Sequence, residues 1–134
     1  MSETLVDSSV VLDILTEDPE WLEWSASALE QRAEESLLVI NPIIYAEISI
    51  RFERIEDLEG ALPASTFRRD PLPREAAFLA GKCFLTYRKR GGARRSPLDF
   101  YIGAHAAVAG MTLLTRDAAR YRTYFPRLDL ITPA

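Results

Sequence analysis

The segment Thr4-Leu5-Val6-Asp7-Ser8-Ser9, with residues 10–15 that follow it, decides the fold. Residues 4–7 are typical of a short buried strand that ends on an acid, because apolar side chains lead directly into Asp7. Ser8 or Ser9 can cap a helix in which the apolar residues of 10–15 recur at helical spacing. A strand that passes directly into a helix is the first half of a β–α unit, which favours an α/β fold.

The alternation of apolar strands and amphipathic helices continues to the end of the chain. Further strands are expected at residues 37–40, near 66–67, at 112–114 and at 128–131. Helices are expected at residues 19–35, 42–53 and 55–62, from Pro73 to the Gly91-Gly92 pair, at 99–109, and briefly after Asp117. Strands separated by helices pair in parallel. The sequence therefore predicts a three-layer α/β/α sandwich around a mainly parallel sheet of four to five strands.

Length and composition indicate one domain spanning residues 1–134, since the chain can bury a real core but is too short for two. Hydrophobic residues make up 48% and charged residues 27% of the chain, the profile of an ordinary globular protein. No apolar run approaches the roughly 20 residues that a membrane span needs. The acidic start lacks the basic region of a signal peptide, so a cytoplasmic location is expected.

The chain has a single cysteine, Cys83, and a single histidine, His105. One cysteine allows no intrachain disulfide, and the common zinc sites need several histidine or cysteine ligands. A histidine acid–base pair, as in metal-free ribonucleases, needs two imidazoles. We expect His105 to pack within its helix and Cys83 to be a small buried hydrophobe. Carboxylates therefore remain the main source of chemistry.

Four carboxylates stand where an α/β sheet places its functional residues. Asp7 and Asp117 each follow an apolar strand directly, and sites in such sheets gather beyond the carboxyl ends of the strands. Asp99 lies at a helix start among core-like neighbours, and Glu47 lies on an apolar helix face where an acid needs a partner. No basic residue stands beside all four. A hard divalent cation, Mg²⁺ or Mn²⁺, is the partner that suits such a carboxylate set best.

Each of these acids also has an ordinary structural explanation. Asp7 and Asp117 can each cap the helix that follows, and Asp99 can be a first-turn acid favoured by the helix dipole. Glu47 can pair with Arg51 one helical turn later. If the acids instead meet in space, their repulsion should raise the pKa of one or more of them until a metal enters. The metal interpretation depends on that meeting, which the sequence alone leaves open.

Four segments of the chain resemble the PIN-domain family, and in particular the VapC toxins of bacterial and archaeal toxin–antitoxin pairs. In chain order they are Leu5-Val6-Asp7-Ser8-Ser9, Pro42-Ile43-Ile44-Tyr45-Ala46-Glu47, Leu98-Asp99-Phe100-Tyr101-Ile102-Gly103-Ala104-His105-Ala106 and Leu113-Leu114-Thr115-Arg116-Asp117. Each segment alone is weak, whereas four in this order and at this spacing are fairly specific. The resemblance covers essentially the whole chain, although residues 58–73 match no pattern of the family.

The resemblance implies a PIN-like fold and hydrolysis of RNA phosphodiesters, in tRNA, rRNA or mRNA, with one or two Mg²⁺ or Mn²⁺ ions. Carried over residue by residue, the family's acidic metal ligands fall on Asp7, Glu47, Asp99 and Asp117, and its supporting hydroxyl falls on Thr115. With water as the nucleophile, the products are expected to carry 5′-phosphate and 3′-hydroxyl ends.

Partners follow from the same resemblance. Similar toxins bind a VapB-like antitoxin in an apolar groove built by N-terminal helices, and related toxins commonly form a homodimer. Trp21 and Trp24 can line such a groove or belong to the core, and we expect at least one of them in the core. No membrane partner is expected.

Charge is divided unevenly along the chain, whose formal net charge is −4. Residues 1–59 hold 15 acids and 3 bases, while residues 60–134 hold 5 acids and 13 bases. The acidic first half suits a basic partner, and the basic second half suits nucleic acid. A solvated helix end with favourable cations is the other explanation of the basic residues. As a phosphate-binding rim we expect Arg88, Lys89, Arg90, Arg94, Arg95 and Arg116.

Two other functions remain open at this point. One is a nuclease-inactive PIN-like module that docks RNA or a partner protein, although the four intact acids speak against it. The other is a Mg²⁺-dependent phosphatase on a different α/β fold. Asp7 is followed by Ser8-Ser9 with no second acid two residues later, which disfavours the aspartate-based phosphatase pattern.

Overall fold

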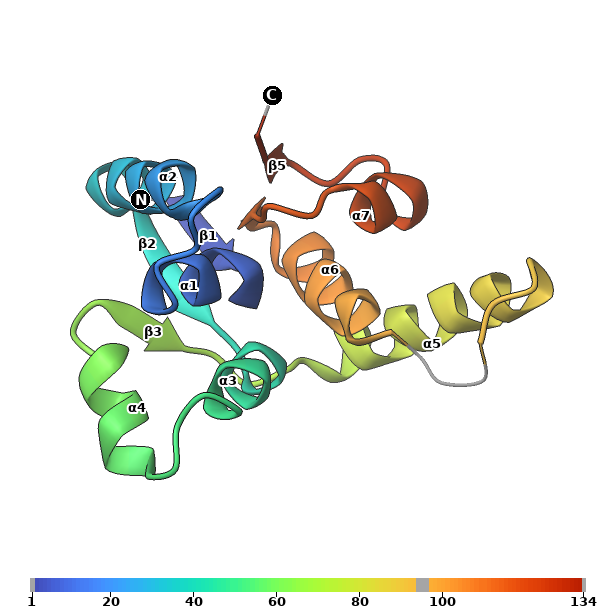
Figure 1. Ribbon diagram of the computed structural model, residues 1–134. Helices are drawn as coiled ribbons and strands as arrows, with labels where there is room; N and C mark the ends of the chain where they lie inside the picture. Colours follow the sequence, from blue (N-terminus) through green and yellow to red (C-terminus); the bar gives the residue numbers. More distant parts are fainter. Residues whose placement is uncertain (1, 94–96, 134) are drawn as a thin grey trace.

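Five parallel strands form one sheet in the computed structural model, which describes residues 2–93 and 97–133 (Figure 1). They are β1 (Ser2–Val6), β2 (Ser36–Ile40), β3 (Phe67–Arg69), β4 (Thr112–Leu114) and β5 (Leu130–Ile131). Their spatial order is β3-β2-β1-β4-β5. The chain thus runs outward from β1 to one edge and returns to the other side of β1. The switch point of the sheet lies between β1 and β4, where ligand sites of such folds are found.

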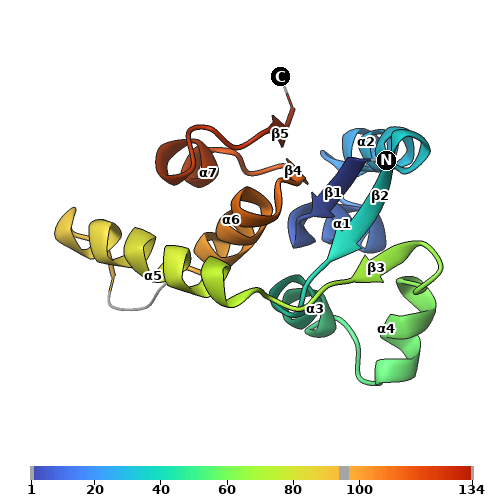
Figure 2. The ribbon, with the colours of Figure 1, turned by 180° about the vertical axis from the view of Figure 1, so that it is seen from behind.

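Seven helices connect the strands within the described ranges: α1 (Ser8–Leu15), α2 (Leu22–Glu35), α3 (Pro42–Ser49), α4 (Ile55–Ala61), α5 (Arg74–Lys89), α6 (Leu98–Ala109) and α7 (Ala119–Tyr124). Crossovers between parallel strands are right-handed, so helices that link strands in opposite directions cover opposite faces of the sheet. Figures 1 and 2 show α1 to α4 on one side of the molecule and α5 to α7 on the other. The expected three-layer, PIN-like α/β/α fold is confirmed.

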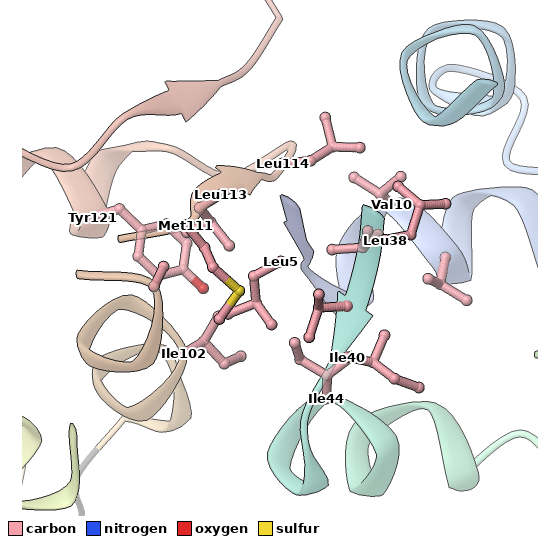
Figure 3. Packing of buried hydrophobic residues seen from close by; sticks show 14 of the residues in the cluster. Leu5, Val10, Leu38, Ile40, Ile44, Ile102, Met111, Leu113, Leu114 and Tyr121 are labelled. Atoms are coloured by element: carbon pink, nitrogen blue, oxygen red, sulfur yellow. The ribbon is translucent and has the colours of Figure 1, made fainter. Parts of the chain in front are cut away.

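The core is built on the two central strands. Leu5 and Val6 of β1 and Leu113 and Leu114 of β4 are fully buried, because central parallel strands are covered on both faces. Full burial of an aliphatic side chain stabilises the fold by about 1.5–3 kcal/mol. Figure 3 shows Leu5, Leu113 and Leu114 in one cluster with Tyr121 of α7, whose hydroxyl is directed inward. The strands next to the switch point are therefore packed on both faces.

Asn41 sets the start of α3. Its side-chain oxygen accepts the Ile44 N–H at 2.9 Å, and Pro42 occupies the first turn. The Asn41 amide nitrogen donates to Nδ1 of His105 on α6 at 3.0 Å, so this buried imidazole is neutral with its proton on Nε2. Burial lowers the pKa of His105. The expectation of a helix-packed histidine is confirmed, and Cys83 is buried as expected.

Several element boundaries differ from the sequence prediction. The second helix begins at Leu22 rather than at Pro19, because the Asp18 carboxylate accepts the N–H groups of Glu20 and Trp21 at 2.9 Å each and forms a separate turn. The helix expected over 42–53 ends at Ser49. The last strand is shorter than expected. These are end effects that leave the order of elements unchanged.

Gly103 fixes how closely α6 approaches the end of α7. A Cβ atom at this position would lie 2.5 Å from the Phe125 ring, so only glycine leaves room for the aromatic side chain. This contact holds α7, which follows the loop after β4, against the body of the fold. No helix in the described ranges is long and apolar enough to cross a membrane.

Candidate active site

Asp7 is the centre of the candidate site, because it follows β1 at the switch point and is only 5% exposed. Its N–H donates to the carbonyl of Leu114 at 2.9 Å, which joins the end of β1 to the end of β4. Its Oδ2 accepts the Thr115 hydroxyl at 2.7 Å and the Tyr121 hydroxyl at 3.3 Å. Although Asp7 precedes α1, its side chain makes no capping hydrogen bond. The helix-cap explanation is therefore wrong, and the carboxylate faces the site.

Burial raises the pKa of Asp7, and the negative charge of Asp99 raises it further. The hydrogen bond from Thr115 acts in the opposite direction and lowers this pKa. Hydrogen bonds from the protein thus offset only part of the cost of burying the negative charge of Asp7. An additional positive charge would stabilise it.

Glu47 of α3 is half-buried and turns toward Asp7. The Ser8 hydroxyl donates to its Oε1 at 2.9 Å. Burial raises the pKa of Glu47, and the charges of Asp7 and Asp99 raise it further. Among the described residues no ion pair with Arg51 is formed, so the structural explanation of this acid is wrong. The partner that its apolar surroundings required is a hydroxyl on another helix.

Asp99 lies in the first turn of α6, as expected. Its Oδ1 is 3.5 Å from the Tyr121 hydroxyl, and its Oδ2 is 3.5 Å from Nη1 of Arg120. Burial raises the pKa of Asp99; the Arg120 charge opposes this shift and the charge of Asp117 adds to it. The favourable place at the helix start therefore does not cancel the desolvation of the carboxylate.

Asp117 is the most exposed of the four acids, with 71% of its side chain accessible. Its N–H donates to Oγ1 of Thr115 at 3.1 Å, so Thr115 links the backbone of Asp117 to the carboxylate of Asp7. The residue before α7 is Ala118, and no side chain caps that helix. Asp117 is therefore not a helix cap.

The four acids lie close enough for the charge of one to shift the pKa of another. Asp7, Glu47 and Asp99 each feel the charge of at least one other member, and Asp99 feels that of Asp117. Oxygen donors of this kind suit Mg²⁺ or Mn²⁺ and fit poorly with zinc. Within residues 2–93 and 97–133, no group of three or more acidic, histidine or cysteine side chains forms a closed ligand set. The donor chemistry fits a hard cation, while the side chains remain spread apart.

Arg116, expected in the phosphate-binding rim, is engaged elsewhere. Its Nε and Nη2 donate to the two carboxylate oxygens of Asp13 at 2.8 and 3.0 Å, and the guanidinium lies over the Trp21 ring. Asp13 is 2% exposed and also accepts the Ser25 hydroxyl at 2.8 Å. The pair joins α1 to the loop after β4. Arg116 thus positions the neighbouring acid whether or not it also contacts RNA.

The other members of the predicted rim divide into two groups. Arg88, Lys89 and Arg90 lie exposed at the end of α5, which extends away from the sheet in Figures 1 and 2. Arg94 and Arg95 lie outside the described residues.

The two tryptophans are both half-buried on the α1–α2 side. Trp24 packs against the core, as expected for one of them, whereas Trp21 is covered by Arg116.

Sequence reasoning missed three residues of the site: Asp13, Arg120 and Tyr121. The signal for Asp13 was available, because it is an acid on the apolar face of α1, where burial demands a partner. Tyr121 stands four residues after Asp117, but no motif or spacing in the sequence pointed to it as a site residue. Arg120 had no pattern that separated it from the other arginines of the second half.

The fold and the acidic switch point define a three-layer α/β protein with a carboxylate site. Residues 4–126 match the PIN domain family, and the chain belongs to that family. PIN domains are generally nucleases, which supports a hydrolase that acts on nucleic acid. No curated protein sequence matched the chain.

Solved toxin–antitoxin structures share the fold. A chain of VapBC2 from Rickettsia felis, bound to a DNA fragment from its promoter, has a TM-score of 0.75 at 18% identity and covers 98% of this chain and 99% of its own. A chain of DNA-bound VapBC from Salmonella typhimurium has a TM-score of 0.70 at 16% identity, with 98% of each chain covered. A toxin–antitoxin complex from Klebsiella pneumoniae gives 0.68 at 21% identity, also over 98% of each chain. At these identities the similarity shows the fold.

Proposed function

We propose that this PIN domain is a metal-dependent endoribonuclease, the toxin of a VapBC-type pair, acting in the cytoplasm as one domain of 134 residues. The observation that carries the proposal is the convergence of Asp7, Glu47 and Asp99 on the switch point, where the Ser8 hydroxyl bonds to Glu47 and the Tyr121 hydroxyl lies between Asp7 and Asp99. Burial is the main cause that raises the pKa of all three acids. Such carboxylates are the groups that a divalent cation neutralises. Family membership and the fold shared with VapBC structures support the same proposal.

The residues that would hold the cation are Asp7, Glu47, Asp99 and Asp117. Their oxygen donors favour Mg²⁺ or Mn²⁺, and the only histidine of the chain is buried against Asn41. A divalent cation bound by these acids would lower the pKa of water, so that hydroxide is available at neutral pH to attack a phosphodiester.

The surrounding hydroxyls keep the acids ionised and oriented. Oδ2 of Asp7 accepts the Thr115 and Tyr121 hydroxyls and has a 3.4 Å contact with the Ser9 hydroxyl, whereas the one side-chain contact of Oδ1 among the described residues is with the Ser8 hydroxyl at 3.4 Å. Oδ1 is therefore the oxygen available to a ligand. Ser8 holds Glu47 in the same way, because its hydroxyl donates to one carboxylate oxygen and leaves the other open. Groups that orient ligands in this manner typically change metal affinity or activity by about 10–100-fold.

RNA is the proposed substrate, in tRNA, rRNA or mRNA. The exposed cations Arg88, Lys89 and Arg90 at the end of α5 provide charge for its backbone. Arg116 contributes by holding the loop after β4 through Asp13. The expected products carry 5′-phosphate and 3′-hydroxyl ends, because water rather than the ribose 2′-hydroxyl is the nucleophile.

We further propose a VapB-like antitoxin and a homodimer as assemblies of the chain. Leu15, Ile50 and Ile55 on the α1–α4 side are 37%, 83% and 64% exposed, which suits an apolar antitoxin segment. Phe78 and Leu85 expose a second apolar surface on α5, 69% and 49% accessible. Light scattering after size-exclusion chromatography, with and without the product of an adjacent reading frame, tests both assemblies.

RNA cleavage by the wild type and by Asp7→Asn tests the activity, with Asp57→Asn as the control because Asp57 is an exposed acid of α4. The wild type and the control should cleave RNA with Mg²⁺ or Mn²⁺ and stop on addition of EDTA. Asp7→Asn should be inactive in every condition. Cleavage in EDTA, or 2′,3′-cyclic phosphate products, would contradict the metal-dependent mechanism. RNA binding without cleavage by the wild type would favour the nuclease-inactive module instead.

A further inference from the structure

An open pocket of about 610 Å³ lies next to the candidate site, between the loop after β4 and α7. Asp99 and Asp117 border it on the side of the acids. Arg120 and Tyr124, both on α7, line its other side. A molecule in this pocket would therefore contact a cation and an aromatic ring immediately beside two of the four acids.

Arg120 has hydrogen-bonding capacity that the protein does not use. A guanidinium carries five N–H donors, and in the described residues this one makes a single long bond of 3.5 Å to Oδ2 of Asp99. Its side chain is 40% exposed. Arg116 differs, because its Nε and Nη2 donate to the two oxygens of the Asp13 carboxylate and its Nη1 is paired with Asp117 at 3.6 Å. Arg120 is thus the arginine beside the acids that remains available to another anion.

Aromatic rings lie against the Arg120 guanidinium and orient it. The Arg120 guanidinium lies over the Tyr87 ring at 5.6 Å, and the Arg90 guanidinium lies over the Tyr124 ring at the same distance. The two rings are neighbours, with centroids 6.3 Å apart. Stacking on an aromatic face orients an arginine and leaves its donors free. The guanidinium groups of Arg90 and Arg120 therefore lie near each other, between the end of α5 and Asp99.

We infer that Arg120 is a phosphate-binding residue whose guanidinium takes a phosphodiester of the RNA strand beside the cleavage site, with Arg90 taking a nearby phosphate. The planar fork of arginine matches two phosphate oxygens, and an RNA backbone presents such groups in series. The long contact with Asp99 places the Arg120 guanidinium between the acids and an incoming phosphate. This inference rests on the proposed ribonuclease function, which supplies the substrate class.

The test is binding of a fluorescent oligoribonucleotide in the inactive Asp7→Asn background at several salt concentrations. Arg120→Gln in that background should weaken binding about tenfold, the loss of one charge-assisted contact. The slope of log affinity against log salt should fall by about 0.7, as expected for one phosphate contact with a single strand. The matched control is Arg122→Gln on the same helix, because Arg122 is exposed and, among the described residues, bonds to Thr132 alone. It should change neither quantity.

Equal binding and equal salt slopes for the Arg120 and Arg122 variants would overturn the inference. Thermal melting of both variants checks that each is folded. Cleavage assays with all four acids intact separate this inference from the proposed function. A wild type that cleaves RNA, with KM unchanged in Arg120→Gln, removes the phosphate-binding role but keeps the nuclease. If the wild type never cleaves RNA but Arg120→Gln still weakens RNA binding, the nuclease proposal is wrong and the phosphate-binding role of Arg120 remains.

Discussion

The Thr115 hydroxyl donates a 2.7 Å hydrogen bond to Oδ2 of Asp7, and thereby joins the loop after β4 to the end of β1 across the switch point of the sheet. Both residues are buried, and Thr115 also accepts the N–H of Asp117. One hydroxyl thus connects two of the four acids. The geometry of the site depends on this loop as much as on the acids themselves.

Thr115→Val keeps the shape of the side chain and removes this donor. Because the Thr115 hydrogen bond lowers the pKa of Asp7, its loss should raise that pKa. The acid limb of the pH–rate profile should then move to higher pH, and activity at neutral pH should fall by about 10–100-fold. The control is Thr112→Val, whose hydroxyl bonds to Asp129 at the surface. Equal profiles for the two variants would show that Thr115 has no role in ionising Asp7.

Tyr121→Phe keeps a fully buried ring in the core and removes the hydroxyl that lies between Asp7 and Asp99. The stability of the protein should change by only about 0.5–1.5 kcal/mol, the net value of a typical hydrogen bond. Mn²⁺ affinity, measured by isothermal titration calorimetry, should fall about tenfold because the two carboxylates lose a shared donor. Tyr45→Phe, which removes a surface hydroxyl bonded to Glu59, is the control. Unchanged Mn²⁺ affinity in Tyr121→Phe would refute a positioning role.

Asp7→Asn should stabilise the metal-free protein near pH 7.5. Burial raises the folded-state pKa of Asp7 above its ordinary value of 3.8, so its contribution to stability is present below pH 3.8 and is lost as pH rises through the folded pKa. A neutral side chain avoids that loss. Thermal melting in EDTA should give a higher Tm for the variant at pH 7.5, with the difference shrinking at acid pH. Added Mg²⁺ should raise the Tm of the wild type more than that of the variant. A lower Tm for the variant in EDTA would contradict this electrostatic interpretation.

Arg116→Ala should destabilise the fold by about 3 kcal/mol, because it leaves the Asp13 carboxylate buried without its cation. Urea denaturation measures the loss, and the exposed Arg122→Ala should cost close to nothing. A second variant, Asp13→Asn with Arg116→Leu, should recover part of the stability, since no unpaired charge remains. If Arg116→Ala is as stable as Arg122→Ala, the ion pair does not hold the loop after β4.

The sequence predicted the order of elements and the general place of the acids because both follow from local rules. Apolar periodicity marked the strands, and Asp7 and Asp117 were placed by following them directly. Partners distant in sequence were beyond such rules. Glu47 needed a partner, and its neighbour Arg51 was as good a candidate as Ser8, which is 39 residues away.

Pairing across the whole chain explains the other misses. Arg116 was expected in the phosphate-binding rim, yet its shortest hydrogen bond is to Asp13, 103 residues earlier. The Tyr121 hydroxyl contacts Asp7, 114 residues earlier, and no local pattern of the sequence indicated that contact. Each of these contacts crosses from one side of the switch point to the other, and only the folded sheet brings the two sides together.

The central claim is that Asp7, Glu47, Asp99 and Asp117 together hold a divalent cation. The most direct measurement is the anomalous signal of Mn²⁺ in crystals grown with the metal. We predict a peak within about 2.0–2.2 Å of carboxylate oxygens of Asp7 and Asp99, the usual distance for small hard cations, and none in crystals of Asp7→Asn. A strong peak bound elsewhere on the chain, or no peak at saturating Mn²⁺, would contradict the account.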